Sequence, residues 1–158
     1  MSMATWQQFA EEAPELAETA RNRFTEHRHH VLATVRKNGA PRVSGTEVFW
    51  YGPDLAVGSM PKARKALDLL RDGRFALHCN PGGETMTEPD VKISGHAEEV
   101  LGKPREEWLR EAQPPGGDGH LFRLELNEVV ATAVAEDQSH LVIRLWRPHM
   151  GIATFHRY

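Results

Sequence analysis

Hydrophobic residues recur along this chain with two different periods. Over Thr5–His27 they return every three to four positions, which predicts two short helices, or one kinked helix, with a break at Pro14. From residue 31 onward the apolar segments are short, rich in β-branched and aromatic residues, and separated by Gly, Pro and Asn, a pattern typical of strands joined by turns. Strands are expected at Val31–Arg36, Arg42–Tyr51, Leu55–Ser59, Arg74–Asn80, Val91–Leu101, His120–Ala135 (bent near Asn127 and Glu128) and His140–Trp146.

Two more helices are expected between these strands. Within Lys62–Arg71 the helical period places apolar residues on one face and charged residues on the other. The apolar ones are Ala63, Ala66, Leu67 and Leu70, and the charged ones are Arg64, Asp68 and Arg71. A short helix begins at Pro104, Pro114–Gly119 is expected to be a loop, and residues 147–158 show no clear period. Because the helices lie between hairpins and do not alternate with strands, we predict a mainly β, α+β fold: an antiparallel barrel of about seven strands with short peripheral helices.

Length and charge narrow the class of protein. The chain has 158 residues, which suits one domain over residues 1–158, with residues 1–28 as a helical segment packed on the barrel. Its 22 acidic and 19 basic residues leave a net charge of −3, which is not the basic balance of a nucleic-acid binder. No apolar stretch approaches the about 18 residues of a membrane span. Acidic residues also occupy the N-terminal region where a signal peptide would be apolar, so we expect a soluble, cytoplasmic protein.

Neither cysteine nor histidine indicates a metal centre. A lone Cys79 rules out an internal disulfide and a multi-cysteine site, and its apolar surroundings favour a small buried side chain. His27, His29 and His30 cluster in sequence but cross from a helix to a strand, so no common face brings them together. We therefore expect no bound metal.

The most informative segment is the junction at Leu55–Leu70. A short apolar strand ends at Gly58 and Ser59, the chain turns, and a helix opens with cations in its first turn. Cations at that end oppose the helix dipole, which already presents positive charge and unpaired N–H groups there. An anion such as a phosphate at this terminus would reverse the sign of the interaction. A solvated basic helix start, costing a few tenths of a kcal/mol, explains the charge equally well.

Four spaced elements together resemble the pyridoxamine 5'-phosphate oxidase superfamily of FMN-binding split barrels. Arg42-Val43-Ser44 opens the second strand, as an arginine does in that family, and Gly58-Ser59 precedes an Arg64-Lys65 pair after a short turn. Residues 91–98, with an apolar run, a glycine and an Ala-Glu pair, resemble a later strand of the family. The resemblance covers residues 29–101 and is specific through order and spacing, not through any single motif.

That resemblance implies a cofactor site and an assembly. Arg42, Ser59, Arg64 and Lys65 would contact the FMN phosphate, the backbone of Val43, Ser44 and Gly58 would line the isoalloxazine ring, and Asp90 stands where the family has a flavin-contacting glutamine. Family members are homodimers with the flavin at the subunit interface, so a partner subunit would complete each site. A guanidinium and an ammonium at a helix N-terminus suit a phosphate dianion.

Three departures separate the chain from a vitamin B6 oxidase. Glu47 occupies the position of the lysine that binds the substrate phosphate, and a carboxylate there would repel a phosphorylated substrate. Asp90 replaces the glutamine and, when ionised, accepts hydrogen bonds without donating any. The C-terminal arginine-histidine-aspartate substrate motif is missing. The chain therefore resembles the flavin or deazaflavin reductase branch of the superfamily.

We expect an FMN-dependent oxidoreductase that moves hydride or electrons between a nicotinamide, or another small electron donor, and a small organic substrate other than pyridoxamine phosphate. The flavin would supply the redox chemistry, so no catalytic side chain is expected to stand out. Two alternatives remain open: a reductase dependent on coenzyme F420, and a flavin- or haem-binding module without turnover, for which His149 or His156 is a candidate haem ligand.

Overall fold

Two helices form the N-terminal segment of the computed structural model, which describes residues 2–85, 87–114 and 119–158. Helix α1 (Trp6–Glu12) is capped by Thr5, whose Oγ1 accepts a hydrogen bond from the Gln8 N–H at 3.1 Å. Helix α2 (Pro14–Glu26) starts with proline, which has no N–H to lose at that position. The predicted pair of helices with a break at Pro14 is confirmed.

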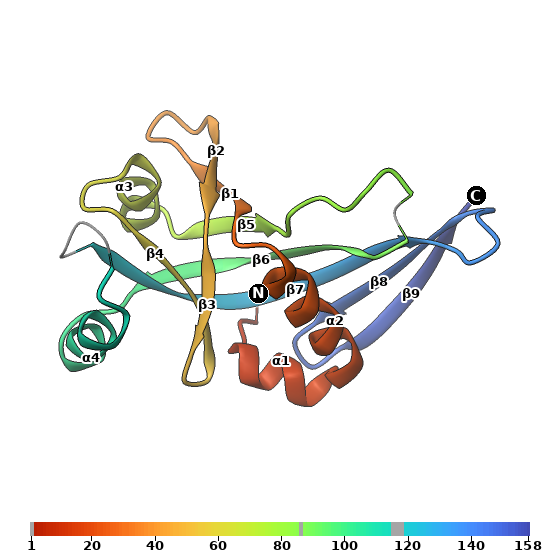
Figure 1. The fold of residues 1–158 in the computed structure, drawn as a ribbon, viewed down its shortest axis with the longest axis horizontal. Coiled ribbons are helices and arrows are strands. Elements are labelled where there is room, and N and C mark those ends of the chain that lie inside the picture. The colour runs from red at the N-terminus through yellow and green to blue at the C-terminus, as the bar shows by residue number, and fades with distance from the viewer. Residues whose placement is uncertain (1, 86, 115–118) are drawn as a thin grey trace.

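The rest of the chain builds one antiparallel sheet. Its strands are β1 (His30–Val35), β2 (Pro41–Thr46), β3 (Val48–Tyr51), β4 (Asp54–Ser59), β5 (Arg74–His78), β6 (Asp90–Glu99), β7 (His120–Val134), β8 (Leu141–Arg147) and β9 (Gly151–Arg157). They are hydrogen-bonded in the order β2-β1-β5-β6-β7-β4-β3, and β8 pairs with β7 on one side and β9 on the other. The sheet curls without closing, so the fold is an antiparallel split barrel with short helices, as predicted (Figure 1).

Strand β7 joins the two halves of this sheet. It runs for 15 residues and pairs with β6 along most of its length, with β4 over its first part and with β8 over its second. Opposite Asn127 the register with β6 shifts between Ser94 and Gly95, which is a bulge that bends the strand where a bend is predicted. Gly95 is required there, because a Cβ would lie 1.8 Å from the carbonyl oxygen of Glu125.

The described strands differ from the prediction in two places. The predicted strand Arg42–Tyr51 is split at Glu47 into β2 and β3, which pair with different neighbours. Residues 151–157, which have no clear period in the sequence, form β9. All its residues are exposed, so no alternation of burial is imposed on the strand and no periodic signal arises. Within the described residues the sheet consequently has nine strands where about seven are predicted.

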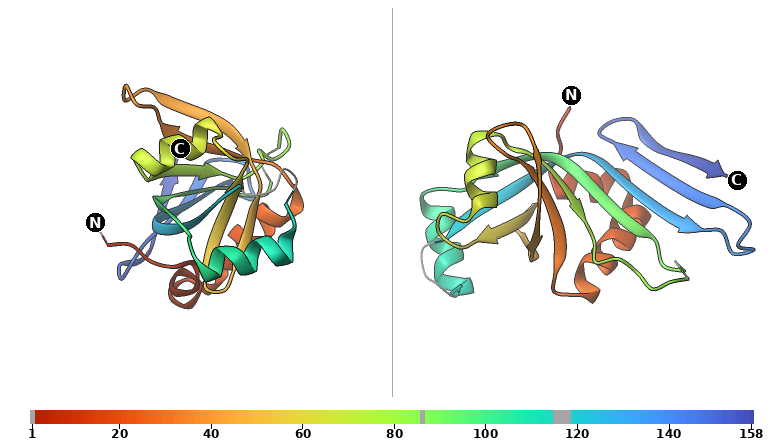
Figure 2. Two further views of the ribbon diagram at one scale, coloured as in Figure 1. Left: turned by 90° about the vertical axis from the view of Figure 1, so that its left-hand side faces the viewer. Right: turned by 90° about the horizontal axis from the view of Figure 1, so that it is seen from above.

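Helices α3 (Arg64–Arg71) and α4 (Lys103–Ala112) pack at the same end of the molecule, and the β8–β9 hairpin extends at the opposite end (Figures 1 and 2). The face predicted for α3 is confirmed for Ala66, which is buried, and for Ala63, which packs against the core, and is wrong for Leu67, Leu70 and Asp68. Leu67 and Leu70 are 41% and 50% exposed, whereas Ala66, Leu69 and the carboxylate-bearing Asp68 are buried. Asp68 is buried because three donors from other parts of the site hold it, as described below.

A continuous apolar core fills the space between the helices and the sheet. Helix residues such as Trp6, Phe9 and Leu16 belong to the same buried cluster as strand residues such as Leu32 and Ile93. The N-terminal helices therefore pack on the barrel as part of its core. A smaller cluster under α4 is built from Ala56, Trp108 and Leu121, with Phe49 stacked on Trp108 at 5.6 Å between ring centroids.

Candidate functional site

The first turn of α3 carries two cations and no cap. Ala63 is the N-cap residue of α3, and no side chain in the described chain makes a capping hydrogen bond there. The first-turn N–H groups of a helix have no intrahelical acceptors. The turn before it is tightened by Lys62, whose φ of 60° lies in the left-handed region and whose N–H donates to His120 Nε2 at 3.3 Å. Arg64 is exposed, and among the described residues its guanidinium has no hydrogen-bond or ion-pair partner. These are the features of an anion site with its donors unused.

Lys65 lies against the neighbouring strand. Its Nζ donates to the backbone carbonyl of Gly45 on β2 at 2.9 Å. Burial lowers the pKa of the Lys65 ammonium from its ordinary value, and the charge of Glu47 opposes that shift. The contact brings the first turn of α3 and strand β2 together, as the predicted site requires.

Arg42 on β2 is oriented by a buried carboxylate. Its Nε donates to Asp68 Oδ2 at 2.6 Å, and Thr34 Oγ1 donates to the same oxygen at 2.8 Å. Arg71 Nη2 donates to the other oxygen, Oδ1, at 3.2 Å. Burial acts to raise the pKa of Asp68, which is only 2% exposed, but these hydrogen bonds outweigh it and hold the pKa below its ordinary value. Asp68 is therefore an ionised anchor that fixes Arg42 through Nε and leaves its Nη groups without a partner among the described residues.

The remaining predicted residues on β2 and β4 lie beside this group. Arg42 and Ser44 point to the face of β2 that Leu32 and Thr34 share on β1, because residues paired across strands point the same way. Val43 points to the opposite face and is 71% exposed. Ser59 ends β4 opposite His120, and its hydroxyl donates to the Met60 carbonyl at 3.1 Å. The structure thus brings β2 against α3 through the Arg42–Asp68 and Lys65–Gly45 contacts, and Arg42, Arg64 and Lys65 are called the cationic group below. Ser59 ends the strand that leads into α3, and in the described chain its hydroxyl donates to the Met60 carbonyl and not to this group.

Gly58 has a packing role. A Cβ at this position would lie 3.1 Å from the indole of Trp108 on α4, so the absence of a side chain lets that ring lie against β4. The indole covers Gly58 on that side, and the backbone of Gly58 pairs with Leu121 on β7. A helix-packing requirement accounts for this glycine without a ligand.

Asp90 lies away from the cationic group within this chain. It begins β6, three strands across the sheet from β2, or about 14 Å at the usual strand spacing. Its neighbour is Arg23 of α2, with Arg23 Nη2 at 4.0 Å from Asp90 Oδ1. No hydrogen bond in the described chain reaches that buried carboxylate oxygen.

Glu47, at the β2–β3 junction, has basic partners. Arg28 Nε donates to Glu47 Oε1 at 2.8 Å, and His29 Nε2 lies 3.6 Å from the same oxygen. All three side chains are exposed, so the pair adds little to stability. The carboxylate is nonetheless close enough to the Lys65 ammonium that its charge partly offsets the lowering of the Lys65 pKa by burial.

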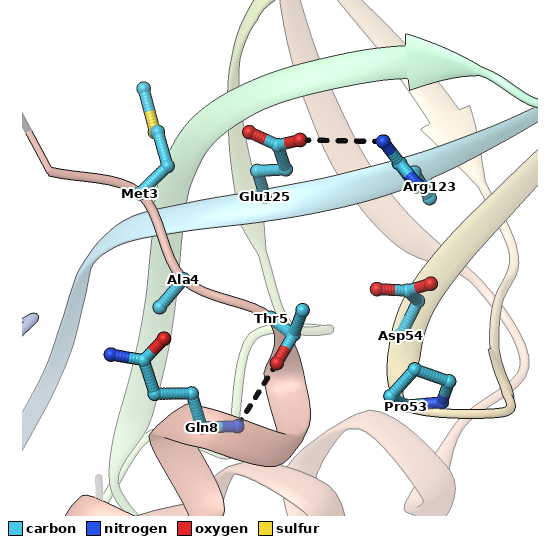
Figure 3. Close-up of a pocket in the computed structure, with 8 residues that line it drawn as sticks. All are labelled: Met3, Ala4, Thr5, Gln8, Pro53, Asp54, Arg123 and Glu125. Atoms are coloured by element: carbon cyan, nitrogen blue, oxygen red, sulfur yellow. Dashed lines mark hydrogen bonds and ion pairs between the residues drawn. The ribbon is translucent and has the colours of Figure 1, made fainter.

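Two cavities lie outside the cationic group. The larger, of about 330 Å³, separates the N-terminal segment from the β3–β4 turn and β7 and contains Asp54, Arg123 and Glu125 (Figure 3). Arg123 is already paired with the carboxylates of Glu98 and Glu125, so the cavity has no unpaired cation for a phosphate among its described lining residues. The smaller, of about 170 Å³, lies on the outer face of β1, β5, β6 and β7, lined by apolar Val31, Ala33 and Val130 with Ser94 and Lys92 at its edge.

Sequence reasoning missed the residues that hold the cations in place. The helical period predicts Asp68 on the charged face of its helix, and the sequence pattern predicts only a strand around Thr34. The available signal was a carboxylate three and four residues from Arg71 and Arg64 on a helix that already faces an arginine-bearing strand. The contact of Lys65 with a backbone carbonyl has no sequence signal, because every residue offers that acceptor.

The expectations for cysteine and membrane spans can be compared with the described residues. Cys79 is a free, buried thiol whose pKa is raised by burial, in agreement with the predicted packing role. Within residues 2–85, 87–114 and 119–158 no helix is long and apolar enough to cross a membrane. The predicted loop Pro114–Gly119 falls mostly outside the described residues.

A family model for pyridoxamine 5'-phosphate oxidase matches residues 16–133 of this chain. The match spans both N-terminal and barrel elements, including the whole cationic group. The chain belongs to the pyridoxamine 5'-phosphate oxidase family. No curated protein matches its sequence significantly.

Solved structures share the fold at low sequence identity. PhzG from Burkholderia lata 383, in complex with tetrahydrophenazine-1-carboxylic acid, is 17% identical with a TM-score of 0.63, covering 90% of this chain and 88% of its own. A pyridoxamine 5'-phosphate oxidase-related, FMN-binding protein from Nostoc punctiforme PCC 73102 is 11% identical, with a TM-score of 0.63 and coverage of 92% and 96%. An F420 reductase is 18% identical, with a TM-score of 0.51 and coverage of 64% and 87%. At these identities the likeness establishes the fold alone.

Proposed function

We propose that this protein is a flavin-dependent oxidoreductase that binds FMN with its phosphate at the N-terminus of α3. The observation that carries the proposal is the pair of unused guanidinium groups, Arg64 and the Nη end of Arg42, beside uncapped helix N–H groups and the Lys65 ammonium. A dianion placed among them would accept charge-assisted hydrogen bonds from the Arg64 guanidinium and the Arg42 Nη groups, which have no acceptor in the described chain, and from the N–H groups of Lys65 Nζ that do not reach Gly45. An FMN-binding relative of the same fold supports this choice of ligand.

The residues present fit the group in charge and in geometry. The Asp68 carboxylate accepts hydrogen bonds from Arg42, Thr34 and Arg71. It is therefore not an ion-pair partner of Arg64. The backbone of Val43 and Ser44 on the edge strand β2 would face the ring, since an edge strand presents unpaired N–H and C=O groups. Gly58 would not line the ring, because the Trp108 indole lies against it.

A second copy of the chain would complete the site. Val43 on β2 and Leu67 and Leu70 on α3 are large apolar side chains exposed on the elements that carry the cations. Burying them in a homodimer would remove that surface from water and enclose the flavin at the interface. Asp90, distant from the cations within one chain, would then contribute to a site only as an interface residue. Size-exclusion chromatography with light scattering is expected to give a dimer mass.

The protein's part in the reaction is binding, orientation and exclusion of water. Bound FMN supplies hydride and electron transfer between a reduced nicotinamide and a small organic substrate. Arg64 and Lys65 anchor the phosphate, Asp68 keeps Arg42 turned toward it, and the partner surface excludes solvent from the ring. Glu47 places a negative charge at the end of β2, which disfavours anionic substrates such as pyridoxamine phosphate.

Coenzyme F420 is the second candidate, favoured by an additional cation beside the same helix. Lys62 precedes α3 and is exposed, and Arg71 ends the helix with its Nη2 bound to Asp68 and to the Val35 carbonyl, so Lys62 is the cation that would extend the site toward a longer acidic tail. The F420 reductase of similar fold supports this alternative. Parallel titrations of apoprotein with FMN and F420 decide between them through the ratio of the two Kd values.

The decisive experiment compares FMN with riboflavin, which has the same ring and no phosphate. The wild-type protein is expected to bind FMN far more tightly than riboflavin. In Arg64→Ala/Lys65→Ala the preference should collapse, because each charge-assisted phosphate contact contributes about 1.5–3 kcal/mol, or about ten- to 150-fold in Kd. Fluorescence quenching of the flavin measures each Kd.

The matched control is Lys103→Ala/Arg110→Ala, which removes the same charge from the exposed surface of α4. It should leave the FMN-to-riboflavin ratio unchanged. An unchanged ratio in the α3 variant would overturn the phosphate assignment. Absorption spectra then separate enzyme from binding module: bleaching by NADPH and recovery with an electron acceptor indicate turnover, and a flavin that no nicotinamide reduces indicates binding alone.

A further inference from the structure

The β8–β9 hairpin carries an ordered cluster of side chains at the end of the molecule opposite α3. His140 lies just before β8, and its Nε2 is 2.9 Å from Nδ1 of His156 on β9. Tyr158 stacks on the His140 ring with 4.5 Å between centroids, and the two histidine rings are 5.0 Å apart. Because Leu141 pairs with Arg157 and Val142 with His156, the strand register holds His140, His156 and Tyr158 on one face.

The hydrogen-bond chain through His140 has one consistent direction. Ser139 Oγ lies 2.6 Å from Asp137 Oδ1, and a carboxylate only accepts, so the single serine proton points to Asp137. The Ser139 oxygen must then accept from His140 Nδ1 at 2.7 Å, which places the His140 proton on Nδ1. In a neutral His140 ring Nε2 then carries no proton, and its lone pair accepts a hydrogen bond from the Nδ1–H of His156. His140 is thus held in the tautomer and orientation that a metal ligand needs.

The two facing nitrogens are spaced for a shared metal ion. Imidazole nitrogens bind transition metals at about 2.0–2.1 Å, so two of them 90–110° apart on one ion lie about 2.9–3.4 Å from each other. The observed 2.9 Å falls at the short end of that range. A metal would replace the proton between the rings, and His156 would carry its proton on Nε2, which faces solvent, so the net charge of the pair does not change.

We propose that His140 and His156 form a two-histidine site for a borderline divalent transition-metal ion, such as Cu²⁺, Ni²⁺ or Zn²⁺. Nitrogen donors select these ions over Ca²⁺ and Mg²⁺, which take oxygen ligands. Ser139 and Asp137 form the outer shell that orients His140, and water fills the remaining positions. No cluster of three or more metal-ligating side chains occurs in the part of the chain that the structure describes, so this is an open site with two protein ligands. A bound ion would add a second link between β9 and the sheet, because β9 pairs only with β8 in the described chain.

The test titrates each metal chloride alone into tag-free protein in a non-chelating buffer, followed by calorimetry. We expect one ion per chain, bound more tightly as Cu²⁺ than as Ni²⁺. His140→Ala and His156→Ala should each abolish that binding, and Ser139→Ala should weaken it about ten- to 100-fold, the usual effect of losing an outer-shell partner. His29→Ala is the matched control, because it removes another exposed histidine that faces a carboxylate.

Two results would overturn the proposal: binding that persists unchanged in both hairpin variants, or the absence of stoichiometric binding by the wild-type protein for all three ions. The ¹⁵N chemical shifts of the imidazole nitrogens give a second readout that does not depend on affinity. Metal should move His140 Nε2 and His156 Nδ1 and leave His29 unaffected, whereas shifts confined to other histidines would contradict the assignment.

Discussion

The two arginine centres of this molecule, Arg23 beside the β5–β6 loop and Arg42 with Arg64 beside α3, differ in how many of their guanidinium donors are paired within the protein. Arg23, 3% exposed, uses every nitrogen: Nε donates to the Pro89 carbonyl at 2.8 Å, Nη2 to the Asn80 carbonyl at 2.9 Å, and Nη1 meets Glu26 and Glu88. Arg42 uses only Nε, and Arg64 uses nothing among the described residues. The buried guanidinium has every donor paired within the protein, as buried polar groups usually do, whereas the more exposed guanidinium groups keep donors that the proposed phosphate would use.

The largest effect is expected from Arg23→Ala, which leaves carboxylates and two backbone carbonyls near the β5–β6 loop without their partner. Glu26 and Glu88 are 36% and 59% exposed and can be hydrated, so the loss comes mainly from the two carbonyls, at about 1–3 kcal/mol of unfolding free energy for each buried acceptor left without a donor. Urea unfolding measures the loss. Arg64→Ala is the control at the other centre and should change stability by less than about 0.5 kcal/mol. A comparable loss in both variants would erase the distinction between the two centres.

The second-largest loss of stability is expected from Asp68→Asn, because it removes the charge that anchors Arg42 while keeping the shape of the side chain. Unfolding free energy should fall by about 1–3 kcal/mol, the usual range for a buried hydrogen-bonded group. FMN affinity should also fall, through the misplaced guanidinium. The same substitution in an Arg42→Ala background should no longer change the FMN Kd, and a full additive loss there would show that Asp68 does not act through Arg42.

As the pH falls, protonation linked to His30, near Arg23, is expected to lower stability before protonation of Asp68 in α3 does. His30 is 2% exposed, accepts from the Asn80 N–H at 2.9 Å and contacts the Phe24 carbonyl, and burial lowers its pKa. Below the unfolded value of about 6.5 the unfolded chain binds a proton that the folded chain does not, so stability falls as pH falls from there. Asp68, with its lowered pKa, loses its contribution only at more acidic pH, below the ordinary carboxyl range.

Urea midpoints at pH 7.5 and pH 5.5 measure this dependence. The wild-type protein should lose stability between them, and His30→Gln should lose less. Equal slopes in the two proteins would assign the pH dependence to other groups.

The smallest effect on the fold is expected from Glu47→Lys. The Glu47–Arg28 pair is exposed, so its loss should cost less than about 1 kcal/mol. The FMN Kd should stay within a fewfold of wild type, while the selectivity of turnover should shift toward anionic substrates. Loss of FMN binding instead would mean that Glu47 lies in the cofactor site.

The contrast between the two centres also explains what could be predicted from the sequence. Arg64 and Lys65 were identifiable because cations at a helix N-terminus contradict the helix dipole, and a local contradiction is visible in sequence. The helices at Pro14, the strands with one buried face and the bend near Asn127 carried equally local signals. Strand β9 was missed because both of its faces are exposed.

Asp68 and Arg23 escaped prediction for a different reason. Each has one partner three residues away, but the partners on other elements are 26 and more than 50 residues away in sequence, so only the folded sheet brings those together. A charged residue on a helix is ordinarily exposed, and no periodic pattern marks the exception. The site could therefore be predicted as far as its anion-facing cations, and not as far as the buried groups that orient them.

The position of β7 in the chain has a consequence for synthesis. In the described part of the chain, the β3–β4 hairpin is hydrogen-bonded to the β1-β5-β6 group through this strand, which follows more than 110 residues of chain. A nascent chain on the ribosome therefore carries unpaired edges of β4 and β6 until residues 120–134 emerge. Such edges are prone to association with other chains, so productive folding in the cell is expected to wait for late translation or for chaperone protection.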